Sequence, residues 1–131
     1  MKKDPKLTNH GRNIMNQLEE GLADKATNSL KELDENLPYL ITDYAFGSVV
    51  GRPGLDLKIR EMLTVASLIS LGNAQPQLEL HMRGALNIGV TPEELLEIVI
   101  QMAVYAGMPA CMNGLTAYRA AIAATKKSNH D

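Results

Sequence analysis

Two ionisable side chains, Glu61 and His81, stand among apolar residues in segments with helical periodicity. At about 100° per residue, Glu61 projects within roughly 40° of the apolar stripe of its own segment, formed by Leu57, Val65 and Leu68. His81 occurs in QLELHMRGALNIG, residues 77–89, where apolar residues occupy the neighbouring helical turns. Both groups are therefore expected to face inward from adjacent helices. An acid and an imidazole that meet in this way can shift each other's protonation equilibrium and support proton transfer.

Each of these residues also has a purely structural interpretation. A single histidine on an apolar face is more often a hydrogen-bonded core residue than a catalyst. Glu61 could equally form an ion pair at an interface, with Arg60 or with Arg83 from another element. Cys111 is the single cysteine, so it has no partner for an intramolecular disulfide. It is either a peroxidatic thiol or, as the alanine-rich surroundings favour, a small apolar filler.

The segments around these groups are predicted to be helices. Asp56 can cap a helix that ends before Gly72, and Thr91 with Glu94 has the spacing of a capping box. Together with the prolines at first-turn positions, these signals predict four helices, at residues 56–71, 76–88, 91–107 and 109–126. The chain is predicted to be all-α.

The 131 residues are expected to form a single domain. Residues 1–36 form an N-terminal arm, in which 5–20 and 24–36 are amphipathic helices or extended chain. Residues 37–126 form the core, beginning with a compact apolar run at 37–46 that the GRPG segment at 51–54 interrupts.

Charge and hydropathy exclude several kinds of partner. Thirteen lysines and arginines against fifteen acids give a net charge of −2, which offers no basic field for nucleic acid. No run reaches the roughly 18 apolar residues of a membrane span, and the N-terminus has no apolar signal segment. We expect a soluble, cytoplasmic protein. The segment from Leu95 to Tyr105 is apolar on nearly every side, which predicts either a homo-oligomer that buries it or a central helix within a monomer.

The order of several motifs resembles the carboxymuconolactone decarboxylase family. These are RPGL at 52–55, the acid at Glu61, LHMRGALN at 80–87, GVTPEE at 89–94 and YAGMPA at 105–110. The resemblance extends from about Leu37 to Ala121. It implies an all-helical bundle of the alkylhydroperoxidase D-like fold, assembled into trimers or hexamers.

The resemblance also implies a choice between two chemistries. In the redox branch of the family, two cysteines precede the histidine by seven and four positions, where this chain has Ala74 and Gln77. Without that dithiol, peroxide reduction by this mechanism cannot proceed. The decarboxylase branch converts 4-carboxymuconolactone, from protocatechuate breakdown in aromatic catabolism, to an enol-lactone with loss of carbon dioxide, and it needs no cofactor or metal.

For a carboxy-lyase of this kind, we expect His81 to transfer a proton and Glu61 to orient it. Arg52 and Arg83 can hold the carboxylates of a lactone substrate, and Tyr44 can donate a hydrogen bond to the lactone. Family decarboxylases tend to carry an arginine, a histidine and a tryptophan where this chain has Asp43, Tyr44 and Phe46. These departures leave open another carboxylated lactone or small anion as the substrate.

The sequence is also compatible with two alternative functions. The first is a thiol-dependent peroxidase that uses Cys111. The second is a non-catalytic helical oligomer that binds a small anion.

Overall fold

The computed structural model describes residues 4–130, and every regular element in that range is a helix. The all-α prediction is confirmed. The chain divides into two compact units, residues 1–57 and 58–131. Their union as the single domain of residues 1–131 stays a prediction.

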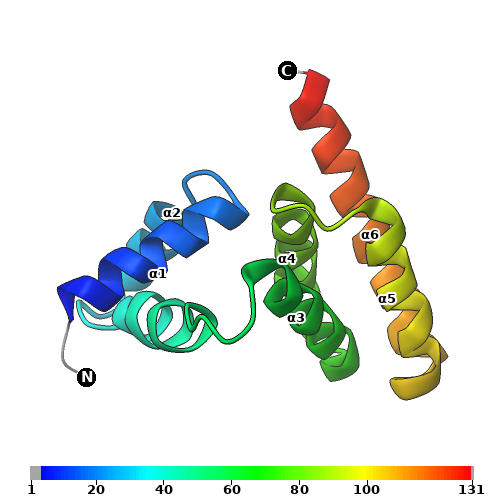
Figure 1. The fold of residues 1–131 in the computed structure, drawn as a ribbon, viewed down its shortest axis with the longest axis horizontal. Helices are drawn as coiled ribbons and strands as arrows, with labels where there is room; N and C mark the ends of the chain where they lie inside the picture. The colour runs from blue at the N-terminus through cyan, green and yellow to red at the C-terminus, as the bar shows by residue number, and fades with distance from the viewer. Residues whose placement is uncertain (1–3, 131) are drawn as a thin grey trace. The chain divides into compact units, whose positions relative to one another are not determined.

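The first unit contains two α-helices and one π-helix. They are α1 (Pro5–Leu18), α2 (Leu22–Lys31) and η1 (Leu40–Val50). The Asp4 side chain caps α1 by accepting a hydrogen bond from the backbone N–H of Lys6, and Pro5 occupies the first turn. The amphipathic helices predicted within the N-terminal arm are thus present. Figure 1 shows α1 in blue lying along η1, which is drawn in cyan.

The π-helix η1 contains most of the apolar run at 37–46. It starts three residues later than that run and continues to Val50, where Gly51 and the GRPG turn end it. A π-helix places one extra residue in each turn, and such segments occur frequently at functional sites. Three of its residues are buried: Thr42, Asp43 and Gly47.

The second unit contains four α-helices close to the predicted ranges. They are α3 (Leu57–Leu71), α4 (Gln75–Asn87), α5 (Pro92–Tyr105) and α6 (Met108–His130). The capping box is confirmed, because the Thr91 hydroxyl accepts from the Glu94 N–H while the Glu94 carboxylate accepts from the Thr91 N–H. Gly72 and Gly89 adopt left-handed conformations where α3 and α4 end, as the sequence predicts.

A single apolar cluster fills the second unit. It draws on all four helices, through Val65, Ile69, Leu78, Met82, Ala85, Val90, Leu95, Val99, Met102, Cys111, Ala117 and Ala121. Helix α4 packs against α6, and so does α5 (Figure 1). Cys111 is buried in this cluster, in the position of the small apolar filler. Within residues 4–130, no helix combines the length and hydropathy needed to cross a bilayer.

Candidate functional site

Helix α3 carries Glu61 into the interior of the second unit. The buried residues of this helix are Glu61, Val65 and Ile69. Val65 of the predicted stripe is thus buried, whereas Leu57 and Leu68 are half-buried. Glu61 is fully buried. Burying a carboxylate costs several kcal/mol unless it is well partnered, so its contacts decide what it can do.

The partner of Glu61 is His81 on α4. The Nδ1 atom of His81 lies 2.8 Å from Oε2 of Glu61. The His81 side chain retains 17% of its surface, against 1% for the side chain of Glu61. The histidine is therefore the member of the pair that a small molecule can reach. The sequence correctly predicts that these two residues meet.

This contact sets the proton positions on the imidazole. An ionised carboxylate can only accept a hydrogen bond, so with Glu61 ionised the Nδ1–H of His81 is the donor. The second ring nitrogen, Nε2, is then the atom that can take up or release a proton. A carboxylate behind Nδ1 also stabilises the imidazolium ion. The arrangement suits a histidine that acts as a general acid.

The other carboxylate oxygen of Glu61 is unusual. Among the residues that the structure describes, Oε1 of Glu61 is the buried side-chain oxygen or nitrogen atom that lacks a hydrogen-bond partner. An unsatisfied buried polar atom lowers stability by about 1–3 kcal/mol. Native proteins tolerate few such atoms, and a catalytic role is one recognised reason for them.

The other predicted site residues are Arg83, Tyr44 and Arg52. Arg83 follows His81 by two positions, so it projects about 200° away around α4 and is half-buried. Tyr44 is 60% exposed on η1, and Arg52 is exposed in the turn after η1. Both belong to the first unit. The second unit by itself brings together Glu61 and His81.

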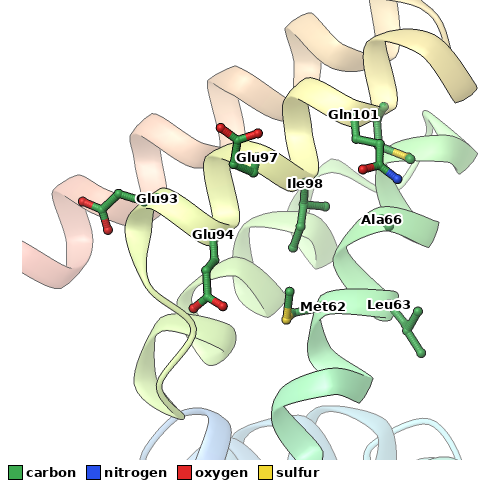
Figure 2. A pocket seen from close by; sticks show the side chains of 9 residues that line it. Met62, Leu63, Ala66, Glu93, Glu94, Glu97, Ile98 and Gln101 are labelled. Atoms are coloured by element: carbon green, nitrogen blue, oxygen red, sulfur yellow. The ribbon is translucent and has the colours of Figure 1, made fainter.

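A cavity of about 510 Å³ lies between α3 and α5 of the second unit (Figure 2). Its lining contains Met62, Leu63, Ala66, Glu93, Glu94, Glu97, Ile98, Gln101 and Met102, so neither Glu61 nor His81 takes part. No sequence pattern predicted this groove. The glutamates at 93, 94 and 97 are evident in the sequence, but nothing there indicates that apolar side chains of α3 lie opposite them.

The electrostatics of the groove do not suit an acidic substrate. Three glutamates stand along its α5 side (Figure 2). The Thr91 backbone N–H and the Lys58 side chain, 3.3 Å away, hold the pKa of Glu94 below its ordinary value and keep it ionised. A dicarboxylate would meet like charges there.

Comparison with known proteins gives three relatives and one family. The sequence model of the carboxymuconolactone decarboxylase family matches residues 35–124. Nitrosuccinic acid decarboxylase npaB of Metarhizium robertsii is 47% identical over 76 residues, which cover 58% of this chain and 52% of the relative. The 4-carboxymuconolactone decarboxylase of Acinetobacter baylyi is 35% identical over 86 residues, 66% of this chain and 63% of the relative.

The third relative is an uncharacterised 15.0 kDa protein of Paracoccus denitrificans, 34% identical over 88 residues, which cover 66% of each chain. The matched stretches span between about half and two thirds of the lengths of these relatives. The N-terminal residues 1–34, including α1 and α2, lie outside the family match.

Proposed function

Because this chain belongs to the carboxymuconolactone decarboxylase family, we propose that it removes carbon dioxide from a small carboxylated acid without a cofactor. The contact between Glu61 and His81 carries this proposal, because it supplies a buried acid and a reachable imidazole in one place. The first candidate substrate is 4-carboxymuconolactone or a related carboxylated lactone. The second is nitrosuccinic acid, which the 47% identity to a nitrosuccinic acid decarboxylase favours.

Both candidate acids allow the same chemistry. The bond between carbon and the leaving carboxylate breaks, and carbon dioxide departs. The electron pair then moves into the lactone carbonyl as a dienolate, or into the nitro group as a nitronate. A proton must finally reach carbon or the conjugated system to give the product. The protein has to hold the anion, stabilise the developing oxygen charge and deliver that proton.

We assign the proton delivery to His81. Nε2–H of the imidazolium donates to the substrate carbon, and the ring regains a proton from solvent before the next turnover. Glu61 holds Nδ1–H in place and stabilises the cationic ring. In this proposal Arg52 binds a substrate carboxylate, and Tyr44 donates a hydrogen bond to the electron-accepting oxygen. Arg83 projects from α4 away from His81 and takes no part.

The peroxidase alternative has less support. Cys111 is buried among the apolar residues of the core. A thiol enclosed in this way is out of reach of a peroxide.

We also propose that the protein is a homo-oligomer, a trimer or hexamer as the family resemblance suggests. Helix α5 buries Leu95, Val99 and Met102 but leaves Val104 78% and Tyr105 76% exposed. Helix α3 also exposes apolar side chains, at Ile59, Leu63 and Leu71, of which Leu63 lines the groove. Large exposed apolar surface beside a groove is typical of a protein interface. The test is sedimentation: Val104→Asp should lower the assembled mass, while Gln101→Glu, a matched charge change on the same helix, should have less effect.

The test of the reaction is a direct assay on the purified full chain. 4-Carboxymuconolactone and nitrosuccinic acid are supplied separately in D₂O, and carbon dioxide and product are followed together. We expect release of carbon dioxide from at least one acid, with one deuterium bound to carbon in the product. Release no faster than in buffer alone from both acids would refute the proposed function.

A further inference from the structure

The backbones of α1 and η1 approach each other closely at two glycines. A Cβ atom added at Gly11 would lie 1.8 Å from the carbonyl oxygen of Thr42, and one added at Gly47 would lie 2.6 Å from the carbonyl oxygen of Leu7. Real Cβ atoms do not approach other atoms this closely, so both positions require glycine. The two helices therefore meet main chain to main chain, which leaves little freedom for one to move along the other.

A third glycine, Gly51, brings His10 to the end of η1. A Cβ atom at this position would lie 2.4 Å from Nε2 of His10. The same Nε2 lies 2.9 Å from the carbonyl oxygen of Gly51. Because a carbonyl only accepts, the His10 Nε2–H is the donor. The ring occupies the space of the absent side chain and holds the peptide that joins Gly51 to Arg52.

The start of η1 is also tied to α1. Asp43 is 3% exposed, and its carboxylate accepts hydrogen bonds from the Asp4 N–H at 2.9 Å and the Thr8 hydroxyl at 2.6 Å. This anion lies at the N-terminus of α1, where the helix dipole stabilises negative charge. The departure from the arginine expected at this position thus has a local reason: the carboxylate binds a helix that lies outside the family match.

From these contacts we propose that α1 positions the substrate-binding segment, with His10 as the positioning residue for Arg52. Helix α1 fixes η1 near its start through Asp43, in its middle through Gly11 and Gly47, and at its end through His10. The segment held in this way carries Tyr44 and leads directly into Arg52. The contacts between α1 and η1 do not depend on the proposed function. Only the binding of a substrate carboxylate by Arg52 rests on it.

The test compares His10→Ala with two reference variants of the full chain. His10→Gln retains an N–H donor at a similar reach and should restore the contact. Asn13→Ala makes a comparable change on an exposed position of the same helix. Amide hydrogen exchange of residues 47–52 reports on the positioning without any substrate, and the Michaelis constant for the acid that is turned over reports on Arg52.

We expect His10→Ala to speed exchange at residues 47–52 and to raise KM by about threefold to tenfold, the loss typical of one hydrogen bond. The value of kcat should change less than twofold, because His10 does not act in the chemistry. His10→Gln and Asn13→Ala should resemble the wild type in both measurements. Unchanged exchange in His10→Ala, or unchanged KM despite faster exchange, would overturn the inference. If neither acid is turned over, the proposed function fails, and the exchange pattern still decides whether His10 holds the turn.

Discussion

Replacing Glu61 by glutamine tests whether its buried carboxylate is needed for catalysis and whether it lowers the stability of the fold. The variant Glu61→Gln keeps the size of the side chain and one carbonyl oxygen that can accept from Nδ1 of His81. A hydrogen bond to a charged group contributes about 1.5–3 kcal/mol and a neutral one about 0.5–1.5 kcal/mol, so this contact weakens by about 1–1.5 kcal/mol.

The opposing contribution comes from the burial of charge. Glu61 is fully buried, and its Oε1 has no hydrogen-bond partner in the part of the chain that the structure describes. Desolvation of a carboxylate costs several kcal/mol, whereas an unpartnered amide group costs about 1–3 kcal/mol. The free energy gained by no longer burying a charge is therefore at least as large as the free energy lost from the weaker hydrogen bond to His81. We therefore expect Glu61→Gln to unfold with a free energy equal to that of the wild type or up to about 2 kcal/mol higher.

Activity should respond in the opposite direction. A neutral amide cannot stabilise the imidazolium of His81, so kcat should fall by about 10²-fold. The chain has no tryptophan, so urea unfolding is followed by far-ultraviolet circular dichroism, alongside carbon dioxide release. Glu79→Gln, on α4 two residues before His81, is the matched control and should leave both quantities near wild type. A loss of more than about 3 kcal/mol in stability, or a kcat within twofold of wild type, would refute this reasoning.

Three further variants test other parts of the structure. Gly11→Ala should destabilise the first unit by about 3 kcal/mol or more, because the added Cβ would overlap the Thr42 carbonyl. Urea unfolding measures this loss, and a loss below about 1 kcal/mol would contradict the close approach of the two backbones. The pKa of Glu94 is lowered in the fold, so its stabilising effect is full above the ordinary glutamate pKa of about 4.3 and is lost as pH falls toward the lower folded value. Glu94→Gln should therefore flatten the decline in stability between about pH 5 and 3, and an unchanged decline would rule out this contribution. Cys111→Ala should keep kcat within twofold, whereas loss of turnover would indicate a thiol mechanism.

The sequence predicted the second unit well because its helices depend on local signals. Capping residues, first-turn prolines and glycines after the last turn fixed the bounds of α3 to α5 within a few residues. The inward directions of Glu61 and His81 followed from periodicity alone, and their contact required only that α3 and α4 pack together.

Other features depend on contacts between distant residues, which periodicity does not record. The apolar run at 37–46 gave no sign of a π-helix, nor of the close approach between its backbone and that of α1. Nothing near Gly11 indicated that Thr42 would approach it. The opposite directions of His81 and Arg83 could have been predicted from their spacing, whereas the groove between α3 and α5 could not.

The most direct test of the central claim is carbon dioxide release by His81→Asn. The asparagine amide can replace the Nδ1–H donor toward Glu61, so the fold and the buried contact are retained, while the ring nitrogen that delivers the proton is lost. We predict a folded protein with the wild-type oligomeric state and a kcat at least 10²-fold lower on whichever acid the wild type decarboxylates. Turnover by His81→Asn at the wild-type rate would show that this histidine is not the proton donor.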